Sequence, residues 1–168
     1  MGTTVEDVTD QLDLTKAAFY YYVENKEELL FQISTQTLAL ADASISAIER
    51  SSETADRKLG LMIDSFVRLV AERPDFFTVY FQEKGHLDAG HLKTVMRVER
   101  KIAGALERVL REGMAGGAFR AADPAVAAFG ILGMCFWIYK WFRPEGRSNV
   151  DEVSRTFQAL VLSGTLTN

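Results

Sequence analysis

Apolar residues recur every three or four positions through most of the chain, which is the spacing of one face of an α-helix. The clearest case is the segment 54–72, and the segments 89–113 and 150–162 show the same period. The apolar stripe of 54–72 consists of Leu59, Met62, Ile63, Phe66, Val67 and Val70. Because no segment shows convincing strand alternation, we predict an all-α chain.

Helix starts are marked by capping residues and prolines. Asn25, followed by "KEE", predicts the start of a long helix that reaches about Arg50. Pro74 begins a short aromatic helix, "PDFFTVYFQEKG", and Asp123 with Pro124 begins an apolar helix. The inward stripe of the long helix is predicted to be Leu29, Leu30, Ile33, Thr37, Leu40, Ala41, Ser44 and Ile48.

The apolar run "AVAAFGILGMCFWIY" covers residues 125–139 and is closed by Lys140 and Arg143. A membrane span needs about 20 residues, so this run is too short and no membrane is expected. A helix that is apolar on nearly all sides must be buried, and in a small protein this indicates a subunit partner.

The composition is that of a globular protein, with 48% hydrophobic and 25% charged residues in 168 positions. A single cysteine and the absence of a signal-peptide pattern at the N-terminus favour a cytoplasmic location. The net charge is −4, and residues 1–30 contain two lysines against seven acidic residues, a balance of −5. An acidic segment argues against nucleic-acid binding, so a DNA-binding motif there must outweigh it.

Two short predicted helices, 5–12 and 16–22, are joined by the tight link "LDL" and form a helix-turn-helix pattern. Thr4 and Thr15 cap these helices, and the second helix is expected to enter the major groove. Its leading residues Lys16, Ala17 and Ala18 are basic or small, which permits close approach to base edges. The hydroxyl groups of Tyr20 and Tyr22 can donate to phosphates, and Lys26 adds positive charge. The alternative is that the tyrosines only pack against the protein, as we expect for Phe19.

The stretch "TTVEDVTDQLDLTKAAFYYYVENKEELL" resembles the DNA-binding segment of the TetR-type transcriptional repressors. The resemblance implies a DNA-binding module at 1–26 and a helical ligand-binding and dimerisation domain at 27–168. It also implies that Tyr20 and Lys26 hold phosphates while Lys16, Ala17, Ala18 and Tyr21 approach bases. The positions that match the family pattern are Thr4, Asp7, Val8, Leu12, Leu14, Thr15, Phe19, Tyr20, Tyr22, Asn25, Lys26, Glu27, Leu29 and Leu30.

The chain departs from the family pattern at Thr9, Asp13, Ala17 and Val23. Members of the family also carry a helix before the "TT" that corresponds to Thr3 and Thr4 here, so we expect a partial module that lacks this first helix. Two readings follow from this expectation: a repressor whose sequence starts further upstream, or a helical acyl-CoA-binding dimer that no longer binds DNA.

The remainder resembles the ligand-binding region of the family, and its ending "WIYKWFRPEGRSNVDEVSRTFQALVLSG" resembles the subgroup induced by acyl-coenzyme A. A repressor that responds to aromatic drug-like compounds is the alternative, since the chain is rich in rings. For each candidate residue, ordinary core packing or solvent exposure is the competing interpretation. The predicted ligand-binding residues are Phe66, Phe77, Tyr80, Phe81, Met96, Arg97, Arg100, Trp137 and Trp141.

The predicted helix 89–113 contains two further charge patterns. Arg97, Lys101, Arg108 and Arg111 lie near one face and form either a phosphate-binding strip or a solvated face. Glu99 is either an acidic pocket group or an ion-pair partner of Arg100 or of another neighbouring charge.

The family forms dimers through its last two helices, which assemble into a four-helix bundle. By this resemblance the glycines of the apolar helix permit close approach of the partner. The predicted interface residues are Gly130, Gly133, Val153, Phe157 and Leu160.

Enzymatic chemistry is not expected. The spacing of His86, Asp88 and His91 does not place them on one helical face, so we predict no metal site and no cofactor. Cys135 has no basic neighbour and is predicted to be an inert buried thiol.

Overall fold

The computed structural model describes residues 25–165, and this part of the chain contains helices and connecting segments without strands. The all-α prediction is therefore confirmed. The elements are α3 (Lys26–Glu49), α4 (Ala55–Glu72), α5 (Pro74–Glu83), the short 3₁₀ helix η1 (Lys84–His86), α6 (Ala89–Ala115), α7 (Pro124–Phe136), α8 (Ile138–Trp141) and α9 (Val150–Thr165).

The helices begin at the capping residues that the sequence indicated. The side chain of Asn25 accepts a hydrogen bond from the backbone N–H of Glu28 at 2.9 Å. Asp123 caps α7 in the same way, directly before Pro124. Asp88 caps α6, which was not among the predicted caps. These side chains satisfy N–H groups that the first turn of a helix leaves without partners.

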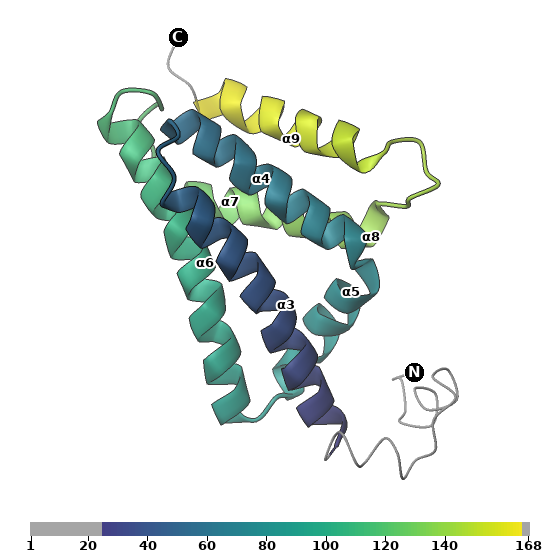
Figure 1. Cartoon of the computed structure of the whole chain (residues 1–168). Helices are drawn as coiled ribbons and strands as arrows, with labels where there is room; N and C mark the ends of the chain where they lie inside the picture. Colours follow the sequence, from purple (N-terminus) through teal and green to yellow (C-terminus); the bar gives the residue numbers. More distant parts are fainter. Residues whose placement is uncertain (1–24, 166–168) are drawn as a thin grey trace.

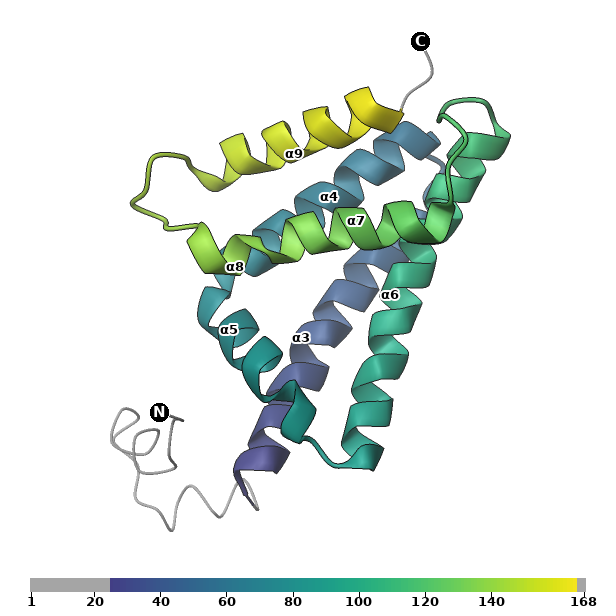
Figure 2. The same cartoon turned by 180° about the vertical axis from the view of Figure 1, so that it is seen from behind.

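The helix α4 lies at the centre of the molecule and contacts α3, α6, α7 and α9. Its predicted stripe is confirmed, because five of the six side chains are fully buried and Phe66 is 1% exposed. Burial of one such aliphatic or aromatic side chain stabilises the fold by roughly 1.5–3 kcal/mol. Figure 1 shows α9 alongside α4, and the view from behind in Figure 2 shows α7 covering α4 from the other side.

The long helices α3 and α6 run in the same direction, because their ion pairs connect positions that increase together along both helices. Lys101 pairs with Asp42, and about two turns further on Arg108 pairs with Glu49. The N-terminal end of α3 and the start of α6 therefore lie at the same end of the molecule, away from α9 (Figure 1).

The stripe predicted for α3 is only partly correct. Ile33 and Leu40 are 42% and 52% exposed, and Ser44 is also exposed. The reason is that α3 packs against both α4 and α6, so its buried surface is rotated relative to the simple apolar face. The buried positions are Leu30, Ser34, Thr37, Leu38, Ala41 and Ile45.

The apolar sequence of α7 suggested a helix that is buried on nearly all sides with the help of a subunit partner. Within one chain, α7 is only partly buried. Only four of its residues are buried, and Val126 and Phe129 are 69% and 68% exposed. Within the described residues, 124–141 is the one stretch long and apolar enough to cross a membrane, with a mean hydropathy of 1.3, and 28% of it is buried.

Candidate functional site

The first turn of α3, which we call the base of α3, contacts the end of α5 and the start of α6. Lys26 forms an ion pair with Glu83 at the end of α5, with a distance of 3.1 Å between Nζ and Oε2. The carboxylate of Glu27 accepts a hydrogen bond from the backbone N–H of Asp88 at 2.8 Å. These two contacts connect the first turn of α3 to the end of α5 and to the start of α6.

Lys26 is the only predicted DNA-contacting residue in the described part of the chain. Its ammonium group is held by Glu83, while 47% of its side chain remains exposed. The other predicted contacts lie outside the described residues, and their roles stay predictions: Thr4, Thr15, Lys16, Ala17, Ala18, Tyr20, Tyr21 and Tyr22.

A cluster of aromatic rings joins α4, α5 and α7, with Phe136 at its centre. The ring of Phe136 lies 5.8 Å from Phe66, 5.9 Å from Phe77 and 6.0 Å from Phe81, measured between centroids. Tyr139 of α8 stacks on Phe81 at 5.2 Å. We call these five residues the aromatic cluster.

Phe66, Phe77 and Phe81 are among the ligand-binding residues predicted from the sequence, whereas Phe136 and Tyr139 are not. Phe136 falls four positions after the buried Leu132, so continuing the buried face of α7 by one turn would have identified it.

The predicted ligand-binding residues fall into a buried and an exposed group. Phe66, Phe77 and Tyr80 are at most 2% exposed and belong to the core. Trp141 lies beside Phe142 and Phe157, away from the aromatic cluster. The structure thus brings part of the predicted set together, and the ligand-binding role of all nine remains a prediction. The exposed members are Phe81, Met96, Arg97, Arg100, Trp137 and Trp141.

A polar network lies next to the aromatic cluster, between α5 and α6. The hydroxyl of Tyr80 donates to Glu99 at 2.7 Å, and the ammonium group of Lys84 donates to the other oxygen of Glu99. Burial and the neighbouring carboxylate both raise the pKa of Tyr80, so its hydroxyl stays protonated and remains a donor. Of the two predicted roles for Glu99, ion pairing with a neighbouring charge is present, although the partner is Lys84.

Three of the four basic residues of the predicted strip on α6 are neutralised by acidic neighbours. Lys101 and Arg108 pair with Asp42 and Glu49 of α3, as described above, and Arg111 pairs with Glu107 one turn earlier. The hydrogen bond from Arg108 lowers the pKa of Glu49, although burial opposes this shift. The pairs with Asp42 and Glu49 connect α6 to α3, and the strip does not present a row of unpaired cations to a phosphate.

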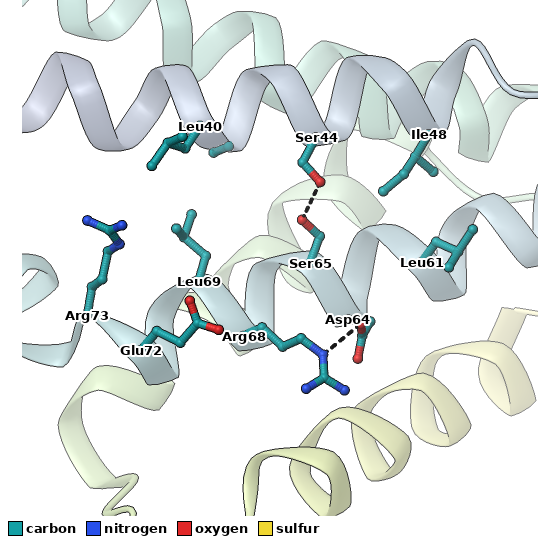
Figure 3. Close-up of a pocket in the computed structure, with 11 residues that line it drawn as sticks. Leu40, Ser44, Ile48, Leu61, Asp64, Ser65, Arg68, Leu69, Glu72 and Arg73 are labelled. Carbon is teal, nitrogen blue, oxygen red and sulfur yellow. Dashed lines mark hydrogen bonds and ion pairs between the residues drawn. The ribbon is translucent and has the colours of Figure 1, made fainter.

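A groove of about 440 Å³ lies between α3 and α4 (Figure 3). Ser44 and Ser65 face each other across it and share a hydrogen bond of 2.9 Å. Apolar side chains, among them Leu40 and Leu69, line it together with charged residues that include Arg68. No predicted ligand-binding residue lines this groove.

The last helices carry an exposed apolar surface. Phe129, Trp137 and Leu160 are 68%, 60% and 60% exposed, and Gly130 and Gly133 are exposed between them on α7. Phe157 is half-buried. Val153 differs from the other predicted interface residues, because it is only 5% exposed and packs inside the chain where α9 covers α4.

Cys135 is fully buried, and burial raises the pKa of its thiol to about 12. The thiolate is the reactive form of cysteine, so this side chain is an inert part of the core, as the sequence indicated.

Residues 25–165 form a helical domain in which the long helix α3 packs against α4 and α6. The family described as "Tetracyclin repressor-like, C-terminal domain" matches residues 52–165. The chain therefore belongs to the TetR family of transcriptional regulators, whose members are repressors that bind DNA.

Relatives and solved structures are similar over almost the whole chain. The TetR-family regulator PfmR from Thermus thermophilus is 30% identical, with a TM-score of 0.89 over 96% of this chain and 88% of that chain. The repressor KstR2 from Rhodococcus jostii is 24% identical over 97% of this chain and 81% of its own length. The structure of AibR in complex with isovaleryl coenzyme A and operator DNA is 26% identical, with a TM-score of 0.84 over 95% of this chain and 86% of that chain.

Proposed function

We propose that the protein is a dimeric, cytoplasmic repressor that binds operator DNA through the module at 1–26 and is released by an acyl-coenzyme A. The observation that carries this proposal is the position of the aromatic cluster and the Tyr80–Glu99–Lys84 network. Both are built on α5 and its neighbours, and α5 and α6 are the elements that hold Lys26 and Glu27 at the base of α3.

The choice of effector rests on chemistry and on a similar protein. AibR, a solved structure 26% identical to this chain, binds isovaleryl coenzyme A. An acyl chain is apolar and suits the aromatic cluster, where Phe81 is 41% exposed and therefore accessible. Arg97 and Arg100 are exposed on α6 near Glu99 and are candidate partners for the coenzyme A phosphates.

The coupling follows from the contacts of α5. A ligand that displaces Phe81 shifts the end of α5, and Glu83 lies two residues further along the same helix. The Lys26–Glu83 ion pair would then pull on the first turn of α3 and change the distance between the two DNA-binding modules of a dimer. A differential affinity of about 1–3 kcal/mol between the two states is enough to couple the sites.

An apolar effector that is flat and aromatic is the second candidate, because five rings gather in the aromatic cluster and rings stack well on one another. The two candidates differ in the need for a coenzyme A moiety, and one titration series separates them.

We would titrate the protein with short- and long-chain acyl-coenzyme A, the matching free acids, coenzyme A alone and a panel of flat aromatic compounds. Binding is followed by the fluorescence of Trp137 and Trp141, and operator binding by the fluorescence anisotropy of labelled DNA from upstream of the gene. We expect saturable binding of an acyl-coenzyme A, weaker binding of its parts and loss of DNA affinity. Binding of aromatic compounds alone would replace the acyl effector by the second candidate.

The variant Phe81→Ala tests the site, because it removes an exposed ring without opening a cavity in the core. It is expected to weaken effector binding by about tenfold, a loss of about 1.4 kcal/mol. Val79→Ala is the matched control, since Val79 lies on the same helix and is 43% exposed. Equal affinities of the two variants would remove the aromatic cluster from the proposal.

A further inference from the structure

Three side chains from two different helices bring potential metal ligands together at the base of α3. Glu27 lies in the first turn of α3, Asp88 caps α6 and His91 lies in the first turn of α6. The Nδ1 atom of His91 is 2.7 Å from Oδ2 of Asp88 and 3.3 Å from Oε1 of Glu27. The ligand atoms of all three residues lie within 4.8 Å of one another.

The three side chains are held in place by contacts that do not involve a ligand. The ring of Phe31 stacks on the imidazole of His91 with a centroid distance of 4.0 Å and an interplanar angle of 23°. One oxygen of Asp88 caps α6, while its other oxygen faces His91. The carboxylate of Glu27 is oriented by the backbone N–H of Asp88. The three side chains are therefore already close to one another, and a bound ion would replace the contact between Nδ1 of His91 and Oδ2 of Asp88.

The charge of this group is unbalanced. A third carboxylate, that of Glu28, lies 3.7 Å from Nε2 of His91, so three carboxylates surround one imidazole. Within residues 25–165, no lysine or arginine forms an ion pair with Glu27, Glu28 or Asp88. A divalent cation between these groups would relieve the repulsion between the carboxylates.

We propose that Glu27, Asp88 and His91 form a binding site for a divalent transition-metal ion such as Zn²⁺. One imidazole nitrogen and two carboxylate oxygens are ligands that Zn²⁺ accepts, with bonds of about 2.0–2.2 Å, and water completes the coordination. The imidazole favours a transition metal over Mg²⁺ or Ca²⁺, which prefer oxygen alone. Glu28 is the nearest candidate for an outer carboxylate, because its Oε2 atom lies 3.7 Å from Nε2 of His91 and a small rotation of the side chain would let it accept a hydrogen bond from this nitrogen.

In the sequence, the spacing of His86, Asp88 and His91 does not indicate a metal site formed by these three residues. That combination is indeed not formed, because His86 is turned toward Glu83, with 78% of its side chain exposed. The missing ligand comes from Glu27, which lies 61 positions before Asp88 in the sequence. Only the packing of α3 against α6 brings it to the site.

The ion would join the first turn of α3 to the first turn of α6, next to the Lys26–Glu83 pair. This arrangement stabilises one orientation of α3 relative to α6. An effect of the metal on operator affinity rests on the proposed function, whereas metal binding itself does not.

The test is direct binding of Zn²⁺ to the tag-free full chain, measured by isothermal titration calorimetry and by metal analysis after dialysis, with Mg²⁺ as the comparison ion. We expect one Zn²⁺ per chain and a higher melting temperature with Zn²⁺. Co²⁺ in place of Zn²⁺ would give visible d–d absorption bands whose intensity reports the coordination geometry, and these bands should change in the His91→Ala variant. No DNA is present in these measurements, so they succeed or fail independently of the repressor function.

The variants have matched controls. His91→Ala and Glu27→Gln are each expected to weaken Zn²⁺ binding by at least about tenfold, and Glu28→Gln by about tenfold as an outer-shell partner. Asp88→Asn removes the charge but keeps a good helix cap, so a loss of binding there does not reflect unfolding of α6. His86→Ala, which removes the only other histidine, is expected to bind as the original chain does. The absence of saturable Zn²⁺ binding, or equal affinity of the His91→Ala and His86→Ala variants, would overturn the proposal.

Discussion

Gly113 lies beneath the ring of Phe119 at the C-terminal end of α6. A Cβ atom at this position would overlap the ring of Phe119, which is itself only 2% exposed and cannot move aside easily. A residue with no side chain is therefore required for the segment after α6 to fold back onto the helix.

We expect Gly113→Ala to destabilise the protein by about 1–3 kcal/mol, because overpacking of a tight core contact has this cost. Gly104→Ala is the matched substitution in the same helix. There the new methyl group meets only the flexible end of Arg108, and the better helix propensity of alanine is expected to stabilise the protein by up to about 1 kcal/mol. Denaturant unfolding measures both, and a Gly113→Ala variant as stable as the original chain would contradict the packing argument.

At the scale of the elements, partly buried carboxylates hold pairs of helices together. Arg108 of α6 lowers the pKa of Glu49 in α3 through its hydrogen bond. Burial raises the pKa of Asp64 in α4, but hydrogen bonds from Arg68 and from Ser154 of α9 outweigh it, so the net shift is downward. The contacts α3–α6 and α4–α9 therefore depend on ionised carboxylates.

We expect the protein to lose stability in acid. A carboxyl group whose pKa is lowered on folding contributes stability that is fully present above its unfolded pKa, and this contribution disappears as the pH falls through the folded pKa. The ordinary values are 4.5 for Glu49 and 3.8 for Asp64, so the loss is expected below about pH 4.5. Thermal unfolding between pH 7 and pH 3 measures it.

The variant Glu49→Gln provides the comparison for this pH dependence. It removes one titrating group and is expected to lower stability at neutral pH by up to about 1 kcal/mol, as is typical of partly exposed ion pairs. The difference from the original chain should become smaller toward pH 3. A difference that is independent of pH would show that the Glu49–Arg108 pair does not contribute to acid sensitivity.

At the scale of the whole molecule, the exposed apolar surface of α7, α8 and α9 is the feature that one chain leaves without a partner. Phe129 is the most exposed ring on this surface, with 68% of the residue exposed. Trp137 follows with 60%. The proposed dimer would bury both, which also explains why α7 has a sequence as apolar as a membrane helix although 28% of residues 124–141 are buried in one chain.

We expect Phe129→Asp to raise the dissociation constant of the dimer by at least about tenfold, because a buried charge replaces a central aromatic contact. Sedimentation velocity over a range of concentrations measures the change. Val79→Asp serves as the control, since Val79 is an exposed apolar residue on α5 and outside this surface. A Phe129→Asp variant that sediments with the original chain at every concentration would place the dimer contact elsewhere.

The helices and most of their starts could be predicted from the sequence, because periodicity and caps depend on residues a few positions apart. Asn25 and Asp123 act as the predicted caps, and the stripe of α4 is buried as expected. The resemblance of residues 3–30 to TetR-type repressors predicted the family. The match of residues 52–165 to the C-terminal domain of this family confirms the prediction.

The candidate sites could be predicted only in part. The rings of Phe66 and Phe77 both lie against Phe136, which the sequence did not indicate, and Lys101, Arg108 and Arg111 of α6 are ion-paired. Local spacing shows which residues share a face of one helix, but it does not show which other helix covers that face.

By itself, therefore, the sequence determined the all-α class, most of the helix starts and the family, but not the break that ends α7 at Phe136 and begins α8 at Ile138. The tertiary structure decided that Glu27 meets His91, that Glu99 meets Tyr80 and that Phe129 stays exposed. The physical reason is that helix formation is governed by near neighbours in the chain. Contacts between side chains far apart in the sequence depend on the order and angle in which whole helices pack.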